Sequence, residues 1–84
     1  MIIAFDPEAF EDFKSWAVED KKVFARIGSL IKDITRSPLH GIGKPEPLKH
    51  ELSGLWSRRI TDEHRLVYKV EKDTVFILSC KYHY

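Results

Sequence analysis

The chain has 84 residues, which leaves room for one small domain and excludes a Rossmann domain, a TIM barrel or a two-domain cleft. Its composition is 43% hydrophobic, 32% charged and 12% aromatic, as in globular rather than disordered proteins. Cys80 is the one cysteine, so neither a disulfide framework nor a cysteine-built zinc site is expected. We therefore predict a single domain over residues 1–84 that is held together by its hydrophobic core.

The net charge of +1 hides an uneven distribution along the chain. Residues 1–20 carry six acidic residues and one lysine, whereas the other 64 residues carry thirteen Lys or Arg and seven acidic residues. Such a split suggests a basic surface for a polyanion, and an ordinary solvated surface is the alternative.

The location of the protein is predicted from what its first residues lack. No apolar run approaches the roughly 18–20 residues needed to span a bilayer, so no membrane partner is expected. The start MIIAFDPEAFEDF turns acidic where a signal peptide would stay basic and apolar. Together with the free cysteine, this favours the cytoplasm.

The first half of the chain predicts a short strand and two helices. Residues 1–5 form an apolar run typical of a strand buried on both faces. Asp6 and Pro7 mark the start of a helix, and Asp20 caps a second helix that ends before Pro38. The two helices form an αα-hairpin, and their predicted buried stripes are Ala9, Phe10, Phe13, Trp16 and Ala17, then Val23, Phe24, Ile27, Leu30, Ile31 and Ile34.

After Gly54 the hydrophobic period changes from 3.6 to 2, which predicts three antiparallel strands with one face on the helices. Arg58 interrupts the apolar face of the first of these strands. We expect Val70 to pair with Phe76 and Leu66 with Cys80, around a three-residue turn over residues 72–74. The expected helix-facing residues of the last two strands are Leu66, Tyr68, Val70, Phe76, Leu78, Cys80 and Tyr82. The order β-α-α-β-β-β predicts an α+β fold, with two N-terminal helices packed on a twisted antiparallel sheet.

This register gathers cations on the open face of the sheet. Arg65 is expected to face Lys81, with His83 diagonal to it, and Arg59 projects from the same face. Like charges opposite one another favour an anion between them, and the forked guanidinium fits phosphate. The alternatives are ordinary surface arginines and a polar, frayed histidine near the chain end.

Glu46 lies between Pro45 and Pro47, which stiffen its backbone, so it is a candidate general base or else a solvated loop residue. The histidines show no metal-ligand spacing, so no metal or other cofactor is expected. One carboxylate, two arginines and a histidine are the groups of a metal-free ribonuclease. Glu46 would take the proton of a 2′-hydroxyl, Arg65 and Arg59 would hold the phosphate, and His83 would protonate the leaving 5′-oxygen.

Four segments of the sequence, KPEPLKH, LSGLWSRRI, EHRLVY and KYHY, together resemble the YoeB (Txe) family of toxins within the RelE superfamily. The resemblance extends over the whole chain. It implies a fold similar to small microbial ribonucleases and the activity of a ribosome-dependent endonuclease that cuts mRNA in the A site and inhibits translation.

The resemblance also implies site residues and partners. Glu46 is implied as general base, Arg65 as stabiliser of the transition state and His83 as general acid. Tyr84 would shape the site, and Lys49 and Arg59 would contact phosphate or RNA. Strict alternation puts Tyr84 on the apolar face, and at a chain end we follow the resemblance. The implied partners are a YefM/Phd-type antitoxin, the ribosome with its mRNA, operator DNA through the antitoxin complex, and a second copy in a homodimer.

Two other functions remain open on the sequence. A non-catalytic RNA- or ribosome-binding module would use the basic face electrostatically and leave RNA uncut. A ParE-like toxin acting on DNA gyrase would share the scaffold, but such toxins lack the acid and base together, so Glu46 and His83 argue against this alternative.

Overall fold

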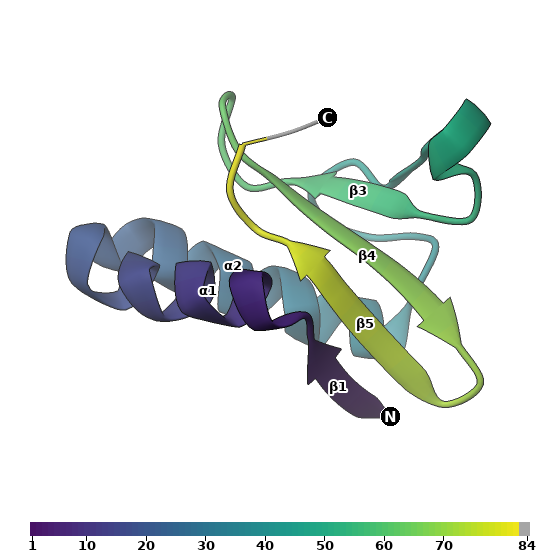
Figure 1. The fold of residues 1–84 in the computed structure, drawn as a ribbon, viewed down its shortest axis with the longest axis horizontal. Coiled ribbons are helices and arrows are strands. Elements are labelled where there is room, and N and C mark those ends of the chain that lie inside the picture. The colour runs from purple at the N-terminus through teal and green to yellow at the C-terminus, as the bar shows by residue number, and fades with distance from the viewer. Residues whose placement is uncertain (83–84) are drawn as a thin grey trace.

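Two helices lie against one face of a mixed sheet (Figure 1). The computed structural model describes residues 1–82, and within them the sheet has five strands in the order β1-β5-β4-β3-β2. Neither helix in this part of the chain is long and apolar enough to cross a membrane. The predicted α+β fold is confirmed. Its elements are β1 (Ile2–Phe5), α1 (Pro7–Glu19), α2 (Lys21–Arg36), β2 (Glu46–Pro47), the 3-10 helix η1 (His50–Leu52), β3 (Trp56–Arg59), β4 (Arg65–Glu71) and β5 (Thr74–Ser79).

Both helices begin at the predicted caps. The Asp6 carboxylate accepts the Glu8 N–H at 3.2 Å, and the Asp20 carboxylate accepts the N–H groups of Lys22 and Val23 at 3.0 and 3.3 Å. These bonds satisfy amide donors that lack a partner inside the helix. The αα-hairpin is confirmed, because the Asp20 that caps α2 also ends α1.

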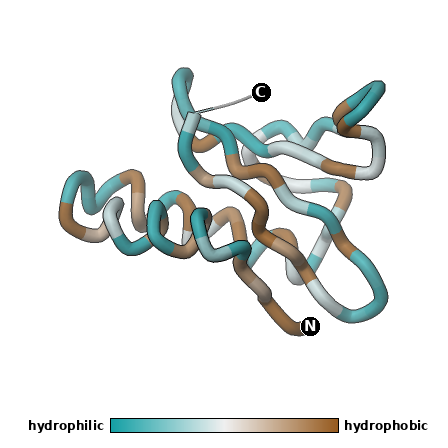
Figure 2. Tube along the Cα trace, viewed as in Figure 1, coloured by the Kyte–Doolittle hydropathy of each residue, from teal (hydrophilic) through white to brown (hydrophobic). Residues whose placement is uncertain are grey.

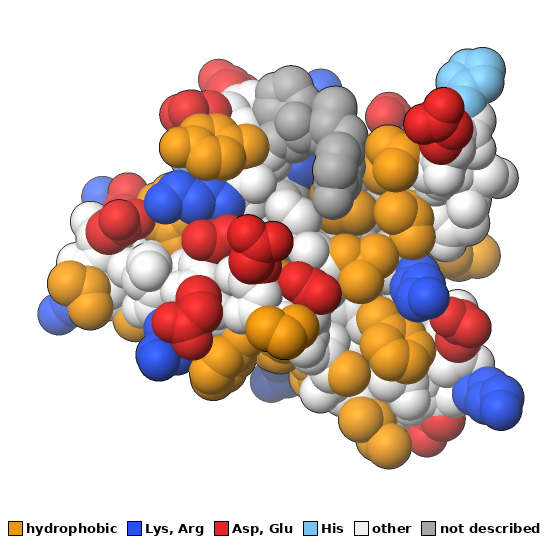
Figure 3. Space-filling view, viewed as in Figure 1, with side chains coloured by type: hydrophobic (Ala, Val, Ile, Leu, Met, Phe, Trp, Pro, Cys, Tyr) orange, Lys and Arg blue, Asp and Glu red, His pale blue; other side chains and the backbone are white. Residues whose placement is uncertain are grey.

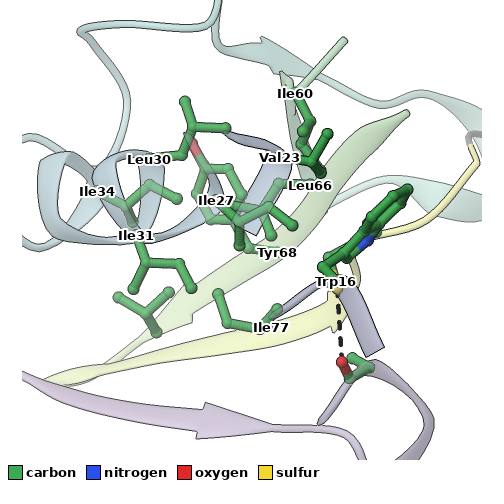
Figure 4. Close-up of a cluster of buried hydrophobic side chains, with 13 residues drawn as sticks. Trp16, Val23, Ile27, Leu30, Ile31, Ile34, Ile60, Leu66, Tyr68 and Ile77 are labelled. Carbon is green, nitrogen blue, oxygen red and sulfur yellow. Dashed lines mark hydrogen bonds between the residues drawn. The ribbon is translucent and has the colours of Figure 1, made fainter. Parts of the chain in front are cut away.

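The core lies between the helices and the sheet (Figure 4). Hydrophobic residues recur along the helices and β5, whereas the β4–β5 turn is hydrophilic (Figure 2). The predicted stripe of α2 is confirmed. In α1, by contrast, Phe10 stays 45% exposed. The buried cluster is Ala9, Trp16, Val23, Ile27, Leu30, Ile31, Ile34, Ile60, Leu66, Tyr68, Val75, Ile77 and Cys80.

The prediction that the first strand is buried on both faces is wrong. β1 lies at the edge of the sheet and pairs in parallel with β5, and Ile2 and Ile3 are 63% and 43% exposed. A four-residue apolar run has the same pattern in a central strand and in an edge strand, so its pattern cannot decide between them. The parallel pairing makes the sheet mixed.

The predicted register of the last two strands holds at only one end. Val67 pairs with Ser79, but Tyr68 pairs with Ile77, so Leu78 is an extra residue on β5. Such a bulge changes which side chains face the core. Val75 and Ile77 therefore face the helices with no exposed surface, where Phe76 and Leu78 were expected, while Cys80 beyond the bulge lies in the core as predicted. The turn between β4 and β5 has two residues, Lys72 and Asp73, and not the three that were predicted. The first of them, Lys72, has a left-handed φ of 56°.

Arg58 does more than interrupt the apolar face of β3. Its side chain has no exposed surface, and its guanidinium donates to the Asp33 carboxylate at 2.6 Å and to the Tyr68 hydroxyl at 3.1 Å. Its other acceptors are the carbonyl oxygens of Ser37, Pro38, His40 and Ile42. One buried cation thereby fastens the chain that leaves α2 onto the sheet, just before this chain reaches Glu46.

Candidate active site

The open face of the sheet carries a polar cavity of about 110 Å³, lined by Lys44, Glu46, Ser57, Arg59 and Arg65. The pairing of the strands accounts for this grouping. Glu46 lies opposite Ser57 in the β2–β3 pair, and Arg59 lies opposite Arg65 in the β3–β4 pair. Three residues that the sequence nominated for catalysis or phosphate binding, Glu46, Arg59 and Arg65, thus line one site.

Glu46 is held in place through the segment that precedes it. The Gly43 carbonyl accepts the Arg59 N–H at 2.7 Å, which ties this segment to β3. A Cβ on Gly43 would lie 2.7 Å from a Leu30 methyl carbon, and its φ is +81°, so this close approach favours glycine. Lys44 then adopts a left-handed φ of 53°, and Glu46 enters the sheet as part of β2. The predicted stiffened loop is therefore a short edge strand.

The guanidinium of Arg65 is anchored along one edge. Its Nη1 donates to the carbonyl oxygens of Thr61, Asp62 and His64 at 2.6, 3.1 and 3.1 Å. The Nε and Nη2 donors have no hydrogen-bond partner among residues 1–82. An arginine held in this way can present its remaining N–H groups to two oxygens of a phosphate without a further loss of side-chain entropy.

The charges that line the cavity do not neutralise one another by direct pairing. Within the described residues, no ion pair joins Glu46 to Lys44, Arg59 or Arg65, although the cations and the carboxylate share one small cavity. None of the acidic residues of α1 lines this cavity, and red side chains gather over that helix (Figure 3). The cavity therefore combines a free carboxylate with excess positive charge, as a polyanion site requires.

Lys49 lies outside this cavity. It lines a second, more open hollow of about 450 Å³ with Glu46, Pro47 and Leu48. Glu46 is common to both, so Lys49 borders the site on the side of β2.

The predicted contact between Arg65 and Lys81 is wrong. The Lys81 ammonium lies 3.7 Å from a Glu19 carboxylate oxygen and over the Trp16 ring, so it faces α1. The physical reason is that β5 ends at Ser79, before Lys81. The chain then leaves the regular ladder, and the Arg65 N–H pairs with the carbonyl of Tyr82, which has a left-handed φ of 60°. His83 and Tyr84, nominated as acid and as shaping residue, lie outside the described residues.

Sequence reasoning missed three residues at or near the site. Ser57 and Arg59 are two residues apart on β3, so their side chains lie on the same face of the sheet. This alternation was the only sequence pattern that could have pointed to Ser57. Lys44 lies two residues before Glu46 and outside β2, with a left-handed φ, so no strand alternation pointed to it. His64 lies in the EHRLVY segment but was given no role, yet its side chain is buried and its Nδ1 accepts the Tyr82 N–H at 2.8 Å.

The sequence also matches a family model described as "YoeB-like toxin of bacterial type II toxin-antitoxin system", over residues 5–84. It is 57% identical to Toxin YoeB of Mycobacterium bovis over 82 residues, which is 98% of this chain and 96% of that protein. The fold is similar to a YoeB/ParE toxin from Agrobacterium tumefaciens, with a TM-score of 0.97, 38% identity and all of both chains covered.

The relative from Staphylococcus aureus has been solved in two states. Its YoeB-YefM complex gives a TM-score of 0.92 at 52% identity, and its YoeB dimer gives 0.93 at 53%. Each comparison covers all of this chain and 98% of the other. Fold, cavity and sequence lead to one assignment: the chain belongs to the YoeB-like toxins of bacterial type II toxin–antitoxin systems, within the RelE superfamily.

Proposed function

We propose that this toxin is a ribosome-dependent endoribonuclease that cleaves mRNA in the A site and thereby inhibits translation in the cytoplasm. The observation that carries the proposal is the shared cavity of Glu46, Arg59 and Arg65, in which a carboxylate and two guanidinium groups face one volume without pairing to each other. A hydroxyl nucleophile beside a phosphate needs a base and a cationic clamp of this kind.

The reaction uses the RNA's own 2′-hydroxyl and no metal. Glu46 accepts the 2′-hydroxyl proton while the 2′-oxygen attacks the adjacent phosphorus. Arg65 and Arg59 stabilise the charge that develops on the phosphate oxygens. The 5′-oxygen leaves with a proton from His83, so the products are a 2′,3′-cyclic phosphate and a free 5′-hydroxyl. Tyr84 shapes the site, and Lys49 contacts the RNA backbone.

We further propose that a YefM/Phd-type antitoxin neutralises the toxin, that operator DNA is bound only through their complex, and that the toxin is a homodimer. The support for the antitoxin and for the homodimer comes from the Staphylococcus aureus relative, whose structures are a YoeB-YefM complex and a YoeB dimer. The cationic cavity adds a physical reason, because an acidic antitoxin segment would complement Lys44, Arg59 and Arg65.

Single-turnover cleavage of mRNA on programmed ribosomes tests the activity. We expect Glu46→Gln to lower the cleavage rate by about 10²-fold, the scale of a general base. Glu8→Gln is the matched control, because it makes the same chemical change on an exposed residue of α1. Ribosome binding without cut RNA from the wild-type protein would support the non-catalytic module instead.

A further inference from the structure

Lys44 lines the candidate active site, but the proposed reaction assigns it no step. Among residues 1–82 its ammonium has no ion-pair or hydrogen-bond partner. Its backbone has a left-handed φ of 53°, which a residue other than glycine adopts at a cost in energy and keeps only where its surroundings hold it. A lysine that reaches a polar cavity from such a backbone is a candidate for a role in the chemistry.

The sheet places Lys44 on the side of the cavity that holds the two arginines. Arg59 lies directly opposite Arg65, and its N–H donates at 2.7 Å to the carbonyl of the residue that precedes Lys44. Glu46 lies one step further along the sheet, because it is opposite Ser57, which is two residues or about 7 Å from Arg59 on β3. Lys44, Arg59 and Arg65 therefore form a row of three cations across neighbouring segments, and Glu46 belongs to the next row.

The proposed reaction moves negative charge between these two rows. When the 2′-hydroxyl proton passes to Glu46, the carboxylate becomes neutral. The phosphate begins with one negative charge and approaches two as the 2′-oxygen bonds to phosphorus. The total charge does not change, so a cation accelerates the step only if it lies closer to the phosphate than to the carboxylate. A phosphate held by Arg59 and Arg65 lies in the row of Lys44, which meets this condition.

We propose that Lys44 is a catalytic residue: its ammonium contacts a non-bridging oxygen of the scissile phosphate, beside Arg59 and Arg65, and stabilises the second negative charge. This inference rests on the proposed function. Its rival is a solvated lysine that only adds to the general attraction between the toxin and the ribosome. Such a lysine would affect how tightly the toxin binds, with a strong salt dependence, and not how fast the bound mRNA is cut.

Single-turnover cleavage of mRNA on programmed ribosomes, with toxin in excess, separates the two roles. We expect Lys44→Met, which keeps most of the side chain's length and removes its charge, to lower the rate at saturating toxin by about 10²-fold. The half-saturating toxin concentration should stay within about threefold of the wild-type value. Lys44→Arg retains the charge and should recover about tenfold of that loss or more.

Lys72→Met is the matched control. Lys72 is exposed and has a left-handed φ of 56°, so it resembles Lys44 in both backbone and charge. It follows β4 at the end far from Arg65, roughly 20 Å away, where physiological salt screens its charge. We expect the rate of this variant to stay within about twofold of wild type. If Lys44→Met does not fold by circular dichroism, Lys44→Asn replaces it, because asparagine tolerates a left-handed φ.

Binding of inorganic phosphate to the free toxin, followed by NMR, tests the contact without the ribosome. In mildly alkaline buffer this phosphate is mainly a dianion, so it carries the charge of the transition state. We expect Lys44→Met to weaken the affinity for phosphate by about tenfold and Lys72→Met to leave it unchanged.

An unchanged rate of Lys44→Met at saturating toxin, or equal phosphate affinities of Lys44→Met and wild type, would overturn the proposal. Failure of the proposed function looks different. Wild-type toxin would then leave the mRNA uncut, while Lys44→Met would still weaken phosphate binding.

Discussion

Arg58 and Arg59 are adjacent on β3 and have opposite surroundings. Arg58 faces the helices, has no exposed surface and is bonded to a carboxylate, a hydroxyl and four carbonyl oxygens. Arg59 faces the open side, is exposed, and shares a cavity with Arg65 and Glu46 without pairing to either within the described residues.

The difference shows that the two faces of β3 have separate roles: the buried face stabilises the fold, and the open face contributes to the candidate active site. A buried charge is tolerated only when every donor finds a partner, so the contacts of Arg58 leave nothing for a ligand. On the other face, Arg59 and Arg65 lie directly opposite each other, a repulsive arrangement that a bound phosphate relieves.

The largest expected effect is on the buried side. Arg58→Met should lower the free energy of unfolding by about 3–5 kcal/mol, because the Asp33 carboxylate and the loop carbonyls lose their partner. Arg59→Met, one residue along, should change it by no more than about 0.5 kcal/mol. Urea unfolding followed by circular dichroism measures both, and similar losses in the two variants would contradict the contrast.

The next effect is on the open side. Arg65→Gln should lower single-turnover mRNA cleavage by about 10²-fold, through the loss of charge stabilisation at the phosphate. Its unfolding free energy should fall by about 1–2 kcal/mol, because the Nη1 bonds to the carbonyl oxygens of the β3–β4 loop are lost, which is less than for Arg58→Met. Rates equal to wild type would remove Arg65 from the site. Lys69→Gln, a cation on the same strand that lies over Phe76, is the matched control.

A smaller effect is expected at Tyr68, whose hydroxyl donates to the Pro38 carbonyl at 2.7 Å and accepts from Arg58. Tyr68→Phe should cost about 1–2 kcal/mol of stability. Burial raises the pKa of Tyr68 above its usual 10.0, so the folded state favours the neutral phenol. That contribution is complete below pH 10.0 and is lost as the pH rises through the folded-state pKa. The Phe variant should lack this alkaline loss in urea titrations.

The smallest effect appears only in acid. The hydrogen bond from Arg58, followed by that from the Ile42 N–H, holds the pKa of Asp33 below its usual 3.8. The stabilisation is therefore complete above pH 3.8 and is lost as the pH falls through the lower folded-state pKa. Asp33→Asn should remove this part of the acid dependence of the urea midpoint. Glu51→Gln, at an exposed carboxylate in η1, should retain it, and parallel acid curves for Asp33→Asn and wild type would contradict the assignment.

The sequence was most informative where one local pattern had one structural outcome. Asp6 and Asp20 are cap residues in any helix of this kind, and the stripe of α2 has a single face to bury. β5 was harder, because Val75, Phe76, Ile77 and Leu78 are apolar on both parities. A bulge at Leu78 then selects the buried set, and no hydrophobic pattern encodes it.

At the site, strand parity was enough to bring Arg59 and Arg65 together, and the two flanking prolines correctly indicated an extended backbone at Glu46. The role of Arg58 depends on carbonyl oxygens from a loop whose nearest acceptor lies 16 residues upstream, and backbone acceptors leave no trace in residue types. The same reason hid His64, whose partner is a backbone N–H.

Cys80 makes the contact between α1 and the end of β5 accessible to kinetic measurement. Its Sγ lies 3.5 Å from the Ala9 carbonyl oxygen, and burial raises the pKa of the thiol to about 12. At neutral pH only about one thiol in 10⁵ is then ionised, and the thiolate is the form that reacts with alkylating reagents. Labelling must wait until the helix separates from the strand. Cys80 is the one thiol in 84 residues, so no other cysteine contributes to the labelling. Its alkylation rate therefore reports how often α1 separates from the end of β5.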